Sequence, residues 1–83
     1  MITSRNNPKI QAVRALMSRR AERQKAGAFV IEGVRLAEEA LTSGWETRQV
    51  FFTTELSERG RTLLAGFRNQ GTEVEEVSPG VLK

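Results

Sequence analysis

Strand-like and helical patterns alternate along this chain, and a glycine stands at nearly every change from one pattern to the next. The pattern is strand-like, helical, strand-like, helical and again strand-like over residues 28–32, 34–43, 48–53, 57–70 and 72–77. Gly27, Gly33, Gly44 and Gly71 mark the changes, as expected for a residue that tolerates positive φ. This alternation predicts an α/β fold, with helices on the faces of a small, largely parallel sheet.

The predicted strands differ in apolar content, and this difference predicts their places in the sheet. Residues 28–32 are nearly all apolar, so we expect a central strand covered on both faces, with Phe29 in the core. Residues 72–77 are polar, which favours a position near an edge. The Ser78-Pro79 pair then has the form of a cap and first-turn proline, and predicts the beginning of another helix.

The chain begins with a helix signal of its own. Asn7 before Pro8 is typical of an N-cap followed by a first-turn proline. Apolar residues then recur at helical spacing from Ile10 to Met17. An unbroken helix would place Arg20 in that apolar stripe, so we expect a break at residues 18–20 and a short basic helical turn after it.

Composition limits the chemistry that this chain can perform. Its 83 residues make one small domain at most, and it contains neither cysteine nor histidine. Disulfides, thiolate nucleophiles, the usual zinc ligands and the usual neutral-pH general base are therefore excluded. There is no apolar run long enough to cross a membrane and no secretory signal, so we expect a cytoplasmic protein without a membrane partner.

No catalytic or metal site can be assembled from the remaining residues. The glycines are too widely spaced for a phosphate-binding fingerprint, and there is no nucleophile and base pair. Glu73, Glu75 and Glu76 form an acidic cluster that we interpret as a solvated strand face. The sequence therefore predicts a binding module with no catalytic residue, metal ligand or cofactor of its own.

Positive charge is concentrated near the N-terminus. Residues 1–27 carry seven basic side chains and one acidic one, a net charge of +6, whereas residues 28–83 carry six and nine, a net charge of −3. The densest cluster has no aromatic residue interleaved for base stacking, and it comprises Arg19, Arg20, Arg23 and Lys25. Such a cluster suits phosphate contacts. Charge alone is equally compatible with the alternative, a basic surface helix that only makes the chain soluble.

Glu32, Gly33 and Arg35 lie at the C-terminal end of the first predicted strand and the start of the next helix, where open α/β folds usually bind ligands. Exposed helix N–H groups and Arg35 could contact phosphates there. The alternative is structural: Glu32 caps the following helix, and Arg35 pairs with Glu39 one turn later.

Three motifs in order give the chain a family resemblance. They are Ser-x-x-Asn-Pro at residues 4–8, Arg-x-x-x-Gly-x-Phe-x-x-Glu-Gly at residues 23–33 and Glu-Ala-Leu at residues 39–41. In this order and spacing the chain resembles the N-terminal substrate-binding domain of the SpoU (TrmH-like) RNA 2′-O-ribose methyltransferases. The resemblance covers nearly the whole chain, and the family pattern falls on Asn7, Pro8, Arg23, Gly27, Phe29, Glu32 and Gly33.

The resemblance implies a three-layer α/β/α sandwich similar to kink-turn-binding ribosomal proteins. It also implies a knotted methyltransferase domain C-terminal to residues 1–83, which binds S-adenosylmethionine and dimerises. On this hypothesis the chain is the RNA-recognition domain of an enzyme that methylates structured rRNA or tRNA. The alternatives are a stand-alone RNA-binding protein of the ribosomal type and an α/β adaptor that binds no nucleic acid. The candidate RNA-contacting residues are Arg5, Asn6, Lys9, Arg19, Arg20, Arg23, Lys25, Glu32, Gly33 and Arg35.

Overall fold

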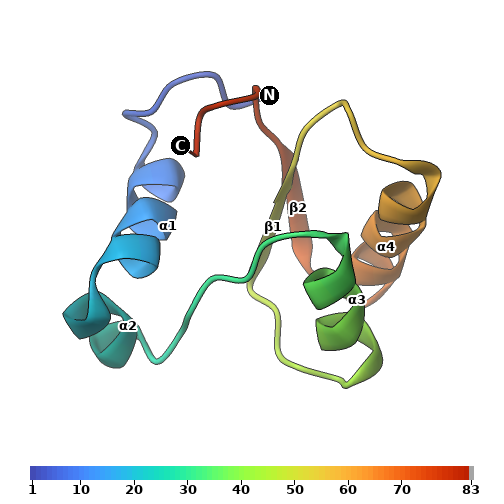
Figure 1. Cartoon of the computed structure of the whole chain (residues 1–83), viewed down its shortest axis with the longest axis horizontal. Coiled ribbons are helices and arrows are strands. Elements are labelled where there is room, and N and C mark those ends of the chain that lie inside the picture. Colours follow the sequence, from blue (N-terminus) through green and yellow to red (C-terminus); the bar gives the residue numbers. More distant parts are fainter. Residues whose placement is uncertain (83) are drawn as a thin grey trace.

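A computed structural model describes residues 1–82, which form four helices and a two-stranded sheet in three layers (Figure 1). The elements in chain order are α1 Pro8–Ser18, α2 Arg20–Ala26, α3 Val34–Thr42, β1 Gln49–Phe52, α4 Glu58–Asn69 and β2 Glu73–Glu76. Helices α1 and α2 lie on one side of the sheet, and α3 and α4 lie on the other. The α/β class predicted from the alternating pattern is therefore confirmed.

The sheet is parallel, as predicted, and β2 is one of its two strands, so it lies at an edge. Strands β1 and β2 pair in register from Gln49 with Glu73 to Phe52 with Glu76. On the other side of β2, Ile2 forms a parallel bridge with Val77. The edge position predicted for residues 72–77 is thus confirmed, and the N-terminal segment adds a single isolated bridge at their C-terminal end.

Side chains alternate between the two faces of the sheet and build a small core on each. On the α1 face, Ile10 is fully buried and packs with three other buried side chains, Ile2, Val77 and Val81. On the α4 face, the buried residues are Ala40 of α3 and Leu63, Leu64 and Phe67 of α4. The strands therefore have one helical layer on each face, and neither layer is large.

The break predicted between the first two helices is confirmed. Arg19 has extended backbone angles, φ −125° and ψ 116°, which end α1 and redirect the chain into α2. The Nη1 group of Arg23 donates a hydrogen bond to the Leu16 carbonyl at 2.8 Å and so satisfies a C-terminal acceptor of α1. Gly27 ends α2 at φ 63°, in the left-handed conformation expected of a helix-terminating glycine.

The central strand predicted at residues 28–32 is not present in the described structure. These residues form an extended connection without ladder hydrogen bonds, between the C-cap of α2 and Gly33, the N-cap of α3. Phe29 is 64% exposed, so its predicted core position is also wrong. A short apolar run indicates a preference for burial but does not identify a pairing partner, and strand propensity depends strongly on context.

The helix predicted after Ser78-Pro79 is likewise not observed within residues 78–82, which form turns. Gly80 has φ 87°, which an α-helix cannot accommodate, and its carbonyl accepts a hydrogen bond from Arg5. Within residues 1–82, no helix has both the length and the apolar character needed to cross a bilayer.

Candidate functional site

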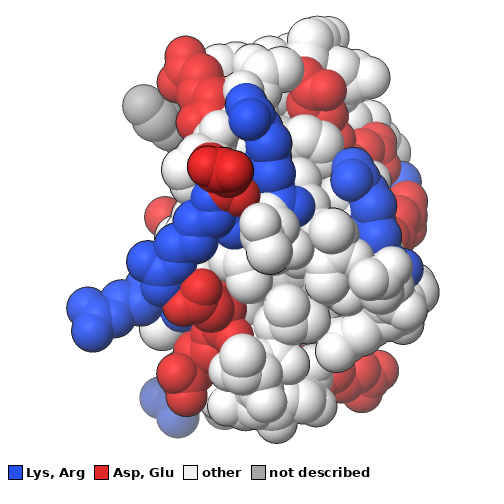
Figure 2. Space-filling model, turned by 90° about the vertical axis from the view of Figure 1, so that its right-hand side faces the viewer, with Lys and Arg blue, Asp and Glu red and all other residues white. Residues whose placement is uncertain are grey.

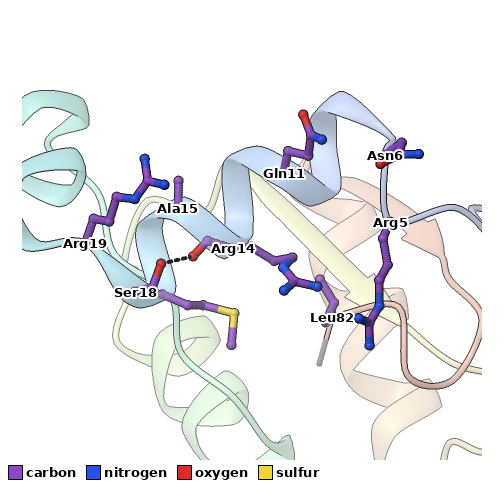
Figure 3. A pocket seen from close by; sticks show the side chains of 9 residues that line it. Arg5, Asn6, Gln11, Arg14, Ala15, Ser18, Arg19 and Leu82 are labelled. Atoms are coloured by element: carbon purple, nitrogen blue, oxygen red, sulfur yellow. Dashed lines mark hydrogen bonds between the residues drawn. The ribbon is translucent and has the colours of Figure 1, made fainter.

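A cationic groove follows α1 on its side facing the C-terminal turn (Figure 3). It has a volume of about 740 Å³. Its lining comprises Arg5, Asn6, Gln11, Arg14, Ala15, Met17, Ser18, Arg19 and Leu82. Three arginines and two carboxamides supply N–H donors, and none of these nine lining residues carries a carboxylate. We call this feature the α1 groove.

The arginines reach the α1 groove from different parts of the chain. Arg5 and Arg14 direct their guanidinium groups toward the same side, next to Leu82, whereas Arg19 lies at the other end beside Ala15 (Figure 3). Arg5 is oriented by a hydrogen bond from its Nη2 to the Gly80 carbonyl at 3.3 Å. Cations spread along an open groove suit an extended anion better than a single small one.

A second hollow, of about 410 Å³, lies beside α2 and the segment that follows it. Its lining comprises Arg20, Arg23, Gln24, Gly27, Ala28 and Phe29. Arg19 lines the α1 groove and its neighbour Arg20 lines this α2 hollow. The junction of α1 and α2 therefore presents a cation to each concave surface.

Besides Arg5, two other predicted contact residues, Lys9 and Arg23, have side-chain partners within the fold. The Nζ of Lys9 lies 2.7 Å from a carboxylate oxygen of Glu73 and 2.7 Å from one of Glu75. These two hydrogen bonds raise the pKa of the Lys9 ammonium group from its ordinary 10.5 to about 12, and the bond with Glu73 has the larger effect. Exposed ion pairs therefore link α1 to β2, and Lys9 neutralises part of the predicted solvated acidic face. Arg23, described above, bonds to the end of α1.

The remaining predicted residues are divided between the groove, the hollow and other surfaces. Arg5, Asn6 and Arg19 line the α1 groove, and Arg20 lines the α2 hollow. Lys25 is exposed on α2, and Glu32, Gly33 and Arg35 are exposed around the start of α3. None of these last four lines either concavity. Gly33 is the N-cap of α3 at φ 93°, and among residues 1–82 Arg35 forms no ion pair with Glu39.

Sequence reasoning missed Gln11 and Arg14 as lining residues. The sequence did contain a signal that these two residues share a surface. Both are polar, they are three residues apart, and they lie on the side of the first helix away from its apolar stripe. Leu82 could not have been found in this way, because only the folded chain brings the C-terminal turn beside α1.

The face formed by α3 and α4 has a different character. Acidic and basic side chains are interspersed on it around uncharged surface (Figure 2). One pair on this face joins Arg59 of α4 to Glu38 of α3, and its hydrogen bonds hold the pKa of the Glu38 carboxyl below its ordinary value. This face has charges of both signs, whereas the charged residues among the nine described ones that line the α1 groove are all arginines.

Known proteins similar to this chain include a domain family and an enzyme. The family model of the MRM3-like substrate binding domain matches residues 7–83. A 23S rRNA (uridine(2479)-2′-O)-methyltransferase from Streptomyces viridochromogenes is 37% identical over 83 residues, which is 98% of this chain and 28% of that enzyme. The chain thus spans little more than a quarter of the length of this relative.

Proposed function

The chain belongs to the family of MRM3-like substrate-binding domains, and from this premise we propose that its substrate is RNA, specifically ribosomal RNA. The resemblance to the substrate-binding domain of SpoU-type methyltransferases is confirmed by the family match. The similar Streptomyces viridochromogenes enzyme is named for methylation of a ribose in 23S rRNA, which supports this choice of substrate.

The observation that carries the proposal is the α1 groove together with the adjoining Arg20. RNA is an extended polyanion with phosphate and hydroxyl acceptors along its length, and the groove offers arginine and amide donors along α1. Contacts of this kind fix the position of an RNA and carry little sequence information. We therefore propose that the groove follows the phosphate backbone of a structured region of rRNA.

In the parent protein, this domain would contribute binding and orientation. Holding one ribose in place converts a bimolecular encounter into an effectively intramolecular reaction, which lowers the barrier to methyl transfer. The transfer itself would take place in a separate C-terminal domain that supplies S-adenosylmethionine and forms the homodimer, as the SpoU resemblance implies. The relative, which is more than three times as long as the aligned region, is compatible with such an arrangement.

The proposal can be tested by neutralising the α1–α2 junction. Arg19 and Arg20 are exposed, and in the described part of the chain their side chains form no hydrogen bond or ion pair. We expect Arg19→Gln combined with Arg20→Gln to weaken binding of a structured rRNA fragment at least tenfold at low salt, without loss of folding. Fluorescence anisotropy with labelled RNA would measure the affinity.

A matched control is Arg61→Gln combined with Arg68→Gln, which removes the same charge from α4 on the opposite layer. An equal loss of affinity in both double variants would show that net charge alone is responsible, and would contradict a localised site. If transfer RNA at the same concentration as the rRNA fragment competed with it for binding, the substrate class would be tRNA instead of rRNA.

A further inference from the structure

Two exposed aromatic side chains meet beside α2. The rings of Phe29 and Trp45 lie edge to face, with centroids 6.1 Å apart and an interplanar angle of 66°. Phe29 is 64% exposed and Trp45 is 48% exposed, so the pair presents ring surface to solvent. The chain brings them together from the segment after α2 and the loop after α3, sixteen residues apart in sequence.

Cationic and amide side chains border this pair. Phe29 lines the α2 hollow together with Arg20, Arg23 and Gln24. Arg48 lies after the Trp45 loop, and its Nη1 donates to the Ala26 carbonyl at 3.3 Å, which ties that loop to the end of α2. The basic helix therefore has an aromatic neighbour, although no aromatic residue is interleaved in its sequence.

Aromatic surface beside arginines is the combination with which proteins bind unpaired nucleotides. Unpaired bases stack on aromatic rings, while cations nearby hold the backbone phosphates. A protein partner would need a matching apolar surface that tolerates these cations, whereas a nucleotide supplies a flat apolar ring and an anion in one unit. The charge beside the pair thus favours RNA as its ligand.

We propose that Phe29 and Trp45 form a stacking platform for an unpaired base of the RNA, with Arg20 and Gln24 contacting the adjacent phosphate and sugar. This proposal rests on the proposed RNA-binding function and adds a preference for loops or bulges over continuous duplex. The α1 groove would then hold the backbone, while the platform selects RNAs that present an unstacked base.

The chain provides its own probe for the platform, because Trp45 is its only tryptophan and it has no tyrosine. An rRNA hairpin with an unpaired loop should quench the emission of Trp45 in the unmodified chain. A fully paired duplex of the same stem sequence should bind without this quenching. This measurement needs no variant, so it does not depend on whether a substitution is tolerated.

Phe29→Leu tests the second ring while keeping an apolar side chain. We expect it to weaken hairpin binding roughly 5- to 150-fold, the range for losing one stacked base, with an unchanged salt dependence. The matched control is Leu36→Ala, which removes exposed apolar surface from α3 and should bind as the unmodified chain does.

Several results would overturn the platform. If the hairpin binds in a salt-dependent manner but emission is equal with hairpin and duplex, the platform is wrong and the proposed function stands. If neither RNA binds, both proposals fail. If emission changes with protein concentration in the absence of RNA, the aromatic pair is an interface between protein surfaces.

Discussion

Lys9 and Arg23 belong to the basic N-terminal segment, and their side chains also make contacts within the fold. Lys9 lies between two carboxylates that are 64 and 66 residues away in sequence. Arg23 reaches back seven residues to the last turn of α1. No local pattern in the sequence could have revealed either partner. The cations that retain freedom to bind a polyanion are therefore fewer than the basic residues of the N-terminal third.

Lys9→Gln should destabilise the domain at neutral pH, and the size of this effect should depend on pH. The folded pKa of Lys9 is raised to about 12 from 10.5, so its contribution is fully present below pH 10.5. It is lost as the pH rises toward and through 12. Urea unfolding of both proteins between pH 7 and 12 would measure this. A stability difference that stays constant up to pH 12 would contradict the ion pair.

Arg23→Ala and Arg20→Ala should separate folding from binding. Arg23→Ala removes charge-assisted hydrogen bonds to the end of α1 and should lower the free energy of unfolding by about 1–3 kcal/mol. Arg20→Ala should change the free energy of unfolding by about 0.5 kcal/mol or less, because Arg20 is an exposed surface residue. The same substitution should nevertheless weaken RNA binding. Thermal unfolding and anisotropy on the same samples would compare them. Equal stability of the two variants would refute the structural role of Arg23.

At the scale of elements, the sequence predicted helices better than strands. The Asn7-Pro8 signal and the glycines at 27, 44 and 71 anticipated helix boundaries, because caps and terminal conformations depend on nearby residues. Residues 28–32 were mispredicted, since strand formation requires a distant partner. The candidate site was partly predicted: the basic cluster was visible, whereas the concavity beside it depends on the packing of α1 against the C-terminal turn.

The attachment of α1 to the sheet depends on one side chain more than on any other. Ile10 is the largest fully buried residue in the described chain. Ile10→Ala should therefore lower the free energy of unfolding by about 2–5 kcal/mol, and Ile10→Val by about 0.5–1.5 kcal/mol. Urea denaturation followed by circular dichroism would test this. A loss below 1 kcal/mol for Ile10→Ala would mean that α1 is not held by this core.

At the scale of the whole molecule, the distribution of charge follows the division of the fold into two helical layers. The basic N-terminal third forms α1 and α2 on one side of the sheet, and the ion-paired α3 and α4 layer forms the other (Figures 1 and 2). A domain with one cationic side can bind a polyanion on that side and leave the other free for the rest of a longer protein.

The salt dependence of RNA binding tests the central claim most directly. The affinity of the chain for a structured rRNA fragment, measured from low to moderate potassium chloride, should fall linearly on logarithmic axes as counterions are released. Arg19→Gln combined with Arg20→Gln should reduce the magnitude of that slope by roughly 1.4 to 1.8, or about 0.7 to 0.9 per phosphate contact. An unchanged slope would contradict phosphate contacts at the α1–α2 junction, and absence of binding at low salt would contradict RNA recognition by this domain.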